Sequence, residues 1–176
     1  MSMELRNIFG VQEYIFTSFA DSRGKFNRIF DTNWLEDDFV IEQVNLSINP
    51  TQYTLRGMHF QKSGKPENKI MYLLAGKIFL SIVDLREKSP TYLMNANKVL
   101  SQASEVAIFI PAGCAVGWLS LEDNVTIQYL MSSRFEQNTY SGFVYNDPQF
   151  NIPWPFEPKI ISDQDKNWQK FHAGES

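Results

Sequence analysis

Short runs of aromatic and β-branched residues, separated by turn-forming residues, recur along most of this chain. Runs of this composition and spacing are typical of β-strands. They occupy residues 14–19, 39–45, 53–61, 69–74, 77–85, 106–110 and 125–131. Many short strands with turns between them predict an all-β protein, built either as a sandwich or as an antiparallel barrel such as a jelly roll.

The run at residues 77–85 has apolar side chains on both of its faces, because apolar residues occur at its odd and its even positions. The Ala75-Gly76 pair just before it predicts a tight hairpin turn that joins this run to the one at 69–74. Because neither face is polar, we expect this hairpin to lie between two layers.

The chain of 176 residues has the length of one ordinary domain. We expect a single domain over residues 1–176, with a C-terminal arm that begins at about residue 147. The proline-rich stretch at 151–158 favours an extended arm over regular structure, because proline lacks the backbone donor of a strand or helix. A short helix after it is predicted to be capped by Ser162 or Asp163.

Charge and composition exclude several classes of function. The formal net charge is −4, the pI is about 5.2 and no cluster of lysine and arginine occurs, so we expect no nucleic-acid partner. The first residues lack the basic and apolar regions of a signal peptide, and no run of about eighteen apolar residues occurs. We therefore expect a soluble, cytoplasmic protein with no membrane partner. Cys114 is the only cysteine, which excludes an intrachain disulfide and a cysteine-rich metal site.

The hexapeptide Arg56-Gly-Met-His-Phe-Gln61 places His59 in a strand-like run. Histidine has the side-chain pKa nearest to neutrality, so it can accept a proton at physiological pH without a large shift. His59 is therefore a candidate general base. A packed, hydrogen-bonded core histidine is the competing interpretation.

Motifs for metal and cofactor binding do not occur in the sequence. Cupin barrels often hold a metal with a His-x-His pair, a later glutamate and a third histidine. Here the only other histidine, His172, lies near the C-terminus. The chain also has no Gly-x-Gly-x-x-Gly, no phosphate-binding Gly-Lys-Ser/Thr and no Gly-x-Ser-x-Gly elbow. We expect neither a metal nor another cofactor.

An ordered set of short motifs runs nearly from end to end of the chain. It comprises Asp21-Ser-Arg-Gly24, Gln43-Val-Asn45, Arg56-Gly-Met-His-Phe-Gln61, Lys69, Val83-Asp-Leu-Arg86 with Ser89-Pro-Thr91, Ile110-Pro-Ala-Gly113, Tyr129, Asn146-Asp-Pro148 and Ile160-Ile-Ser-Asp-Gln-Asp165. In this order and spacing the set resembles the nucleotide-sugar 3,5-epimerases typified by dTDP-4-dehydrorhamnose 3,5-epimerase. The resemblance implies a cupin-type jelly-roll antiparallel barrel with short peripheral helices. It also implies a cofactor-independent homodimer that inverts C3, C5 or both in the 4-keto sugar of a nucleoside diphosphate.

Removal of a proton next to a ketone needs a positioned base and stabilisation of the enolate oxygen. The resemblance assigns His59 as the base and Asp165 as the carboxylate that orients the imidazole and stabilises the imidazolium. It places Lys69 at the keto oxygen and Tyr129 as the acid that returns a proton to the opposite face. From the residues alone, Asp165 is also a candidate for helix capping, and Tyr129 is also a candidate core aromatic residue.

The diphosphate of such a substrate requires cations. The resemblance nominates Arg23 and Arg56, because a guanidinium group binds phosphate oxygens through two hydrogen bonds. Gln43, Asn45 and Phe26 match family positions near the nucleotide. An arginine that merely belongs to a turn is the competing interpretation of Arg23.

Strand geometry raises a difficulty for two of these assignments. Arg56 and His59 are an odd number of residues apart, so in a regular strand their side chains face opposite sides. A bulge at Gly57 would bring both to one side. In a regular strand, one of the two assignments must fail.

The chain also departs from the usual family pattern. The family motif Ile-Pro-x-Gly-x-Ala-His-Gly-Phe contains a second active-site histidine, but here Val116 and Trp118 occupy the histidine and phenylalanine positions. Valine can neither donate a hydrogen bond nor titrate. Arg28 stands where the family often has an acidic residue, and Arg134-Phe135 replaces paired aromatic residues. These changes suggest a paralogue with another sugar, a single inverted carbon or weakened activity.

Two alternatives to the 3,5-epimerase therefore stay open. One is a single-carbon epimerase or a keto-isomerase, which would move the carbonyl group to a neighbouring carbon. The other is a module that binds nucleotide sugars without turnover. A pure binder has little need for His59, Lys69, Tyr129 and Asp165 together.

Overall fold

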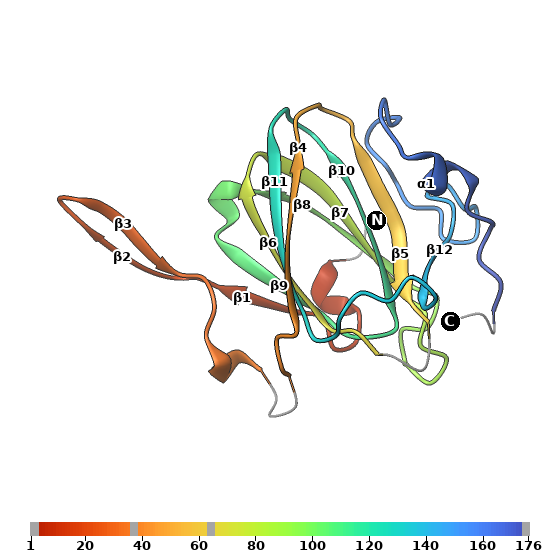
Figure 1. Cartoon of the computed structure of the whole chain (residues 1–176), viewed down its shortest axis with the longest axis horizontal. Helices are drawn as coiled ribbons and strands as arrows, with labels where there is room; N and C mark the ends of the chain where they lie inside the picture. The colour runs from red at the N-terminus through yellow and green to blue at the C-terminus, as the bar shows by residue number, and fades with distance from the viewer. Residues whose placement is uncertain (1–3, 36–38, 63–65, 174–176) are drawn as a thin grey trace.

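Two five-stranded antiparallel sheets pack face to face in the computed structural model, which describes residues 4–35, 39–62 and 66–173 (Figure 1). The first sheet has the order β1 (Gln12–Ile15), β9 (Val106–Ile110), β6 (Lys69–Ala75), β11 (Val125–Met131) and β4 (Gln43–Asn49). The second has the order β12 (Tyr140–Gly142), β5 (Leu55–Gln61), β10 (Cys114–Ser120), β7 (Lys77–Asp84) and β8 (Asn95–Ser101). The expected all-β, antiparallel jelly-roll class is confirmed.

Within residues 4–35, 39–62 and 66–173, helical structure is limited to short segments at the periphery. Among these residues, the 3-10 turns are η1 (Leu5–Asn7), η2 (Thr32–Trp34) and η3 (Gln102–Ser104), and the α-helix is α1 (Asp163–Asn167). The side chain of Ser162 accepts a hydrogen bond from the Asp165 backbone N–H at 3.0 Å, so Ser162 is the cap of α1, as expected. In the described part of the chain, no helix has the length and apolar character needed to cross a membrane.

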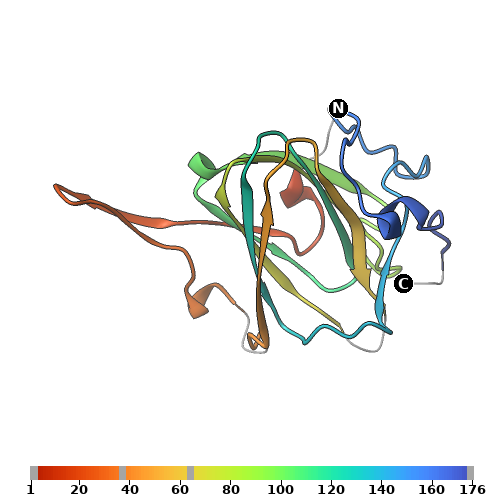
Figure 2. The same ribbon diagram turned by 45° about the horizontal axis from the view of Figure 1, so that its top comes forward.

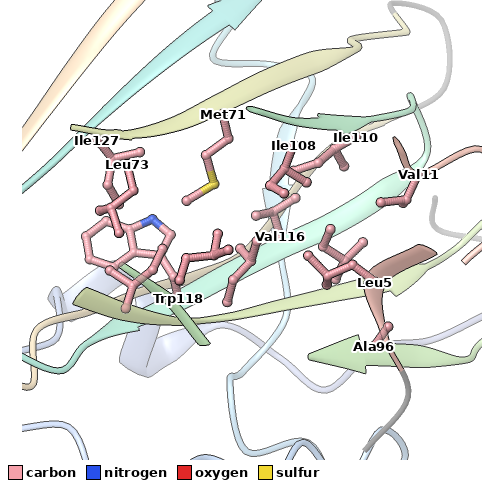
Figure 3. Packing of buried hydrophobic residues seen from close by; sticks show 14 of the residues in the cluster. Leu5, Val11, Met71, Leu73, Ala96, Ile108, Ile110, Val116, Trp118 and Ile127 are labelled. Atoms are coloured by element: carbon pink, nitrogen blue, oxygen red, sulfur yellow. The ribbon is translucent and has the colours of Figure 1, made fainter. Parts of the chain in front are cut away.

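The hydrophobic core lies between the two sheets, because alternate side chains of each sheet point toward the other. Met71, Leu73 and Ile127 of the first sheet face Val116 and Trp118 of the second (Figure 3), and all five are buried. Full burial of one aliphatic side chain of this size contributes roughly 1.5–3 kcal/mol. This layer therefore holds the two sheets at a fixed separation, which also sets the distance between the walls of the cavity described below.

The connection from β6 to β7 is a corner between sheets and not the hairpin that the sequence predicted. β6 pairs with β9 and β11, whereas β7 pairs with β10 and β8. Gly76 makes the turn with a φ of 82°, and a Cβ atom there would lie 2.8 Å from Val125 Cγ2. A tight turn and a sheet corner both require glycine at this position, so the local sequence does not distinguish them.

A bulge in β5 brings Arg56 and His59 to the same side, as the hypothesis about Gly57 required. Val116 of β10 pairs with His59 and Trp118 pairs with Arg56, so three steps along β5 face two steps along β10. Gly57 has a φ of 127°, and a Cβ atom there would lie 2.5 Å from the Gly117 Cα atom. Only glycine fits this backbone conformation and this close approach to β10.

A two-stranded hairpin projects away from the two sheets (Figures 1 and 2). Its strands are β2 (Thr17–Asp21) and β3 (Gly24–Arg28), which form a two-stranded sheet and pair with no other strand of the described residues. The expected strand at 14–19 is therefore divided at Phe16 between β1 in the first sheet and β2 in the hairpin. The expected strand at 39–45 likewise starts only at residue 43. The side chains of the hairpin lie outside the sandwich core.

The segment that follows β12 packs on the outer face of the second sheet (Figure 1). Trp154 lies over Phe79 of β7, with 5.4 Å between the ring centroids, and Ile161 packs in the same cluster. β7 is thus covered by the core on one face and by the C-terminal segment on the other, which accounts for its apolar residues on both faces. The same segment places α1 beside β5.

Candidate active site

A cavity of about 390 Å³ lies between the two sheets. It is lined by His59, Tyr129, Lys69, Arg56, Gln43 and Asn45, all of which the sequence suggested, and also by Ser47, Gln61, Glu67, Val116, Trp118, Met131, Phe135 and Tyr140. The first sheet contributes side chains from β4, β6 and β11, and the second from β5, β10 and β12. Side chains far apart in the sequence therefore face one another across the cavity.

His59 and Asp165 form a hydrogen-bonded pair at the wall made by β5. His59 Nε2 lies 2.7 Å from Asp165 Oδ1, although 106 residues separate them in the sequence. The His59 side chain is 23% exposed and that of Asp165 is 5% exposed, so the imidazole is accessible from the cavity while the carboxylate lies behind it. A carboxylate at Nε2 selects the tautomer with the proton on Nε2, which leaves Nδ1 with the lone pair.

Further donors hold the Asp165 carboxylate in place. The Gly57 N–H donates to Oδ2 at 3.1 Å, and Trp168 Nε1 donates to Oδ1 at 3.3 Å. Burial opposes ionisation of Asp165, but the hydrogen bonds from His59, Gly57 and Trp168 and the attraction to His59 outweigh it and keep its pKa below the ordinary value. The carboxylate is therefore ionised at neutral pH and suited to stabilise a positive charge on His59.

Tyr129 lies on β11, in the sheet opposite His59, and its hydroxyl accepts a hydrogen bond from Trp118 Nε1 at 2.8 Å. Burial raises the pKa of Tyr129 to about 12, and the Trp118 hydrogen bond and the Arg56 charge reduce this rise. The phenol therefore keeps its proton at neutral pH. It has the protonation state of an acid, in contrast to the ionised Asp165.

Lys69 enters the cavity from the start of β6 and forms an ion pair with Glu67. The distance from Lys69 Nζ to Glu67 Oε1 is 2.8 Å, and the two side chains are 15% and 5% exposed. An ammonium group has three donors, so the ion pair leaves donors of Lys69 for a ligand. The cavity thus contains a shielded cation beside a shielded carboxylate.

Arg56 and two amide side chains line the part of the cavity made by β4 and β5. Arg56 Nε donates to Asn49 Oδ1 at 2.9 Å, which holds the guanidinium group against the wall. Gln43 Nε2 donates to Asn45 Oδ1 at 2.8 Å. A fixed guanidinium group with neighbouring amides suits an anionic ligand that also carries hydrogen-bonding groups.

Arg23 and Phe26 are not brought to the cavity of their own chain, because both lie on the projecting β2–β3 hairpin (Figure 1). Arg23 is instead paired with Asp21, with 2.6 Å between Nη2 and Oδ2, and its side chain is 88% exposed. Phe26 is 69% exposed and its ring lies 6.4 Å from that of Phe19. Within one chain, these two residues form a separate exposed surface.

Several cavity residues were not proposed as site residues from the sequence, and three of them lie next to the proposed acid, base and cation. The Tyr140 ring centroid lies 5.1 Å from that of His59, and burial raises the pKa of the Tyr140 phenol. Glu67 and Trp118 are the other two. The position of Trp118, two residues after Val116, was a possible signal, since alternate residues of a strand share a face. The segment around Tyr140 has no strand pattern that could have indicated its place.

Within 4–35, 39–62 and 66–173, no group of three or more histidine, cysteine, aspartate or glutamate residues is arranged to hold a metal ion. The charged groups of the cavity, Arg56, Lys69 and Glu67, are suited to binding polar organic groups.

Comparison with known proteins relates this site to one family. The family model described as dTDP-4-dehydrorhamnose 3,5-epimerase matches residues 6–173. A dTDP-4-dehydrorhamnose 3,5-epimerase of Methanothermobacter thermautotrophicus is 36% identical over 159 residues, which cover 86% of this chain and 84% of the relative. A dTDP-4-dehydrorhamnose 3-epimerase of Streptomyces niveus is 30% identical, with coverage of 94% and 82%.

Solved structures give the same relationship. The dTDP-4-dehydrorhamnose 3,5-epimerase of Bacillus anthracis, solved with TDP and PPi bound, superimposes with a TM-score of 0.90 at 29% identity, over 97% of this chain and 99% of that one. A 4-keto-6-deoxy sugar epimerase from the novobiocin gene cluster of Streptomyces spheroides superimposes with a TM-score of 0.87 at 28% identity, over 97% and 86%. The similarity covers both sheets and the C-terminal segment.

Proposed function

The chain belongs to the dTDP-4-dehydrorhamnose 3,5-epimerase family and is a nucleotide-sugar epimerase. We propose that its substrate is a nucleoside diphosphate that carries a 4-keto sugar, and we expect the nucleotide to be dTDP. The reaction inverts C3, C5 or both through an enolate. The observation that supports this most is the pairing of His59 with Asp165 on one wall of a cavity whose opposite wall presents the protonated phenol of Tyr129.

In the first step, His59 removes the proton from the carbon next to the ketone. The carbon–hydrogen electron pair forms the enolate, and the proton binds to Nδ1, the nitrogen that Asp165 does not engage. Asp165, ionised and 2.7 Å from Nε2, stabilises the imidazolium that results. The pair acts as one unit, because the carboxylate both orients the ring and compensates its new charge.

Lys69 stabilises the oxygen on which negative charge develops. Its side chain is 15% exposed, so a ligand that fills the cavity would exclude most water around the ammonium group. Electrostatic stabilisation is stronger in such a site than in water. Glu67 holds one side of the ammonium group and leaves its other donors for the keto oxygen of the sugar.

In the second step, Tyr129 donates its proton to the opposite face of the same carbon. The enolate becomes a ketone again, and the phenolate and the imidazolium return to their starting states by exchange with solvent. The oxidation state of the sugar is unchanged and only protons move, so acid and base groups are sufficient for the chemistry. This supports a reaction that requires no cofactor.

The diphosphate is expected to bind at Arg56, with Gln43 and Asn45 toward the nucleotide. Arg23 and Phe26 would reach such a ligand only from a second subunit, because their hairpin projects away from its own cavity. The outer face of β4 also exposes a row of apolar side chains: Val44 is 54%, Leu46 57% and Ile48 66% exposed. Such a row on an edge strand favours a homodimer in which the hairpin of one chain serves the cavity of the other.

Complementation between two inactive variants tests this arrangement. Arg23→Ala and His59→Ala homodimers should each be impaired, while co-expressed heterodimers should regain one complete site, built from the His59 of one chain and the Arg23 of the other. The measurement is epimerase activity of purified heterodimers, whose mass should be twice the 20.4 kDa of one chain. Heterodimers no more active than the average of the two homodimers would contradict exchange of the hairpin.

Isotope exchange tests the proposed reaction. We expect the protein, incubated in heavy water with a panel of 4-keto sugar nucleotides, to introduce deuterium at the inverted carbon, with the label and the configuration read by NMR. A sugar nucleotide whose keto group has been reduced is the matched control and should take up no label. A carbonyl found at a neighbouring carbon would indicate a keto-isomerase, and tight binding without label would indicate a binding module.

The number of labelled carbons distinguishes a single-carbon epimerase from a 3,5-epimerase. Val116 pairs with His59 across β5 and β10 and offers no hydrogen bond to the sugar. Label at one carbon only, with inversion there, would identify a single-carbon epimerase. Label and inversion at both C3 and C5 would identify a 3,5-epimerase.

A further inference from the structure

Trp118 connects the two sheets inside the cavity. Its indole lies on β10 of the second sheet, beside Leu73 and Ile127 of the first (Figure 3), and it is 2% exposed. Indole Nε1 donates to the hydroxyl of Tyr129 on β11 at 2.8 Å. The partner of this buried N–H is therefore the one phenol to which the proposed function assigns the acid role.

The direction of this hydrogen bond determines where the phenol proton can go. An indole N–H can only donate, so the Tyr129 oxygen must be the acceptor. The hydroxyl then keeps its own proton, which points away from the indole. Because Tyr129 lines the cavity, that direction is available to a ligand.

The same hydrogen bond becomes stronger when the phenol loses its proton. A bond from an N–H to an ionised oxygen is roughly twice as strong as one between neutral groups. Burial raises the pKa of Tyr129, and the hydrogen bond from Trp118 is the largest of the effects that lower it. Val116, two residues earlier on the same strand, has no polar atom and cannot replace this donor.

We propose that Trp118 is a positioning residue for the acid: its indole N–H aims the Tyr129 proton into the cavity and stabilises the phenolate left after proton transfer. This inference rests on the proposed function of Tyr129. The transfer moves one proton from the phenol oxygen to the sugar carbon, and the electron pair of the broken bond stays on the oxygen, which the indole N–H then holds.

Trp118→Phe removes the N–H and keeps an aromatic ring in the core. We expect kcat for inversion to fall about 10- to 100-fold, the range for loss of one hydrogen bond to a charged group, with KM within about 3-fold of its original value. Deuterium exchange should fall less than inversion, because His59 performs it. Trp154→Phe is the matched control: its Nε1 donates to the Tyr145 carbonyl oxygen, outside the cavity, and the change should alter neither rate.

A second substitution separates the hydrogen bond from packing. Benzothienylalanine at position 118 has the shape of tryptophan with sulfur in place of the N–H, so it fills the same space. We expect it to lower the inversion rate as Trp118→Phe does. If it retains the original rate, the effect of Trp118→Phe comes from packing in the core and the proposal fails.

A titration gives a readout that does not depend on activity. A fluorinated tyrosine placed at position 129 is more acidic, and its ionisation can be followed by absorbance where the protein is stable. We expect its pKa to be higher by about 1 to 2 when Trp118 is phenylalanine. Equal values in the two proteins would overturn the role of Trp118. If the unaltered protein showed no epimerase activity, the proposed function would be wrong. The role of Trp118 would still be tested, because the titration reports on its hydrogen bond to Tyr129 without any turnover.

Discussion

Changing His59 to alanine is expected to abolish deuterium exchange at every exchangeable carbon of the substrate and, with it, inversion. Removal of a general base costs about 10²- to 10⁴-fold in rate, and among the described residues that line the cavity His59 is the only histidine. The measurement is the rate of label uptake by NMR, with circular dichroism to verify the fold. Retained exchange would discredit His59 as the base.

Two further variants make this test specific. His59→Gln keeps a donor for Asp165 but has no basic nitrogen, so it should be as inactive as the alanine variant while preserving the buried hydrogen bond. His172→Ala removes the other histidine, which is exposed near the C-terminus, and should leave exchange unchanged. If His59→Gln were active, the ring would serve binding and not proton removal.

Changing Tyr129 to phenylalanine is expected to separate exchange from inversion. Proton removal by His59 should continue, so deuterium should still enter the substrate. Inversion should fall about 10²- to 10⁴-fold, because the phenol that protonates the opposite face is gone and the proton returns to the original face. The measurement is the ratio of labelled, uninverted substrate to inverted product.

The competing role of Tyr129, as a core aromatic residue, predicts a different result. Loss of packing would lower exchange and inversion together and would reduce the free energy of unfolding. Tyr145→Phe is the matched control, since its hydroxyl contacts Glu157 in the C-terminal segment away from the cavity. Equal loss of both rates in Tyr129→Phe, with Tyr145→Phe unaffected, would recast Tyr129 as a structural or binding residue.

The strands that could be predicted are those with alternating or wholly apolar side chains. β9 and β11 were predicted to the residue for this reason. β8 and β10 were missed, because β8 carries polar residues and β10 contains small ones with Gly117 in its middle. β10 is nevertheless central in its sheet, since hydrogen bonds to β5 and β7 on both sides determine its conformation more than its own side chains do.

The site residues likewise differ in whether the nearby sequence or a contact with a distant strand identifies them. His59 was recognisable because few residue types can act as a base near neutral pH, and the bulge was foreseeable because Gly57 separates it from Arg56. Tyr140 was not recognisable, because its place beside His59 follows from pairing of β12 with β5. Arg23 and Phe26 matched family positions, but their chain carries them away from its own cavity.

From the order of its residues alone, this chain could be recognised as a β-protein with an imidazole, a phenol and an ammonium group suited to proton transfer next to a ketone. Alternation and residue chemistry are local properties, and they determine which face a side chain takes and which protons it can move. The family resemblance also named Asp165 as the carboxylate behind His59, but the fold decided which sheet each strand joins, which aromatic ring lies beside His59 and which donor reaches Tyr129. Those pairings join residues far apart along the chain, and they depend on how two sheets and a C-terminal segment pack, which no local pattern records.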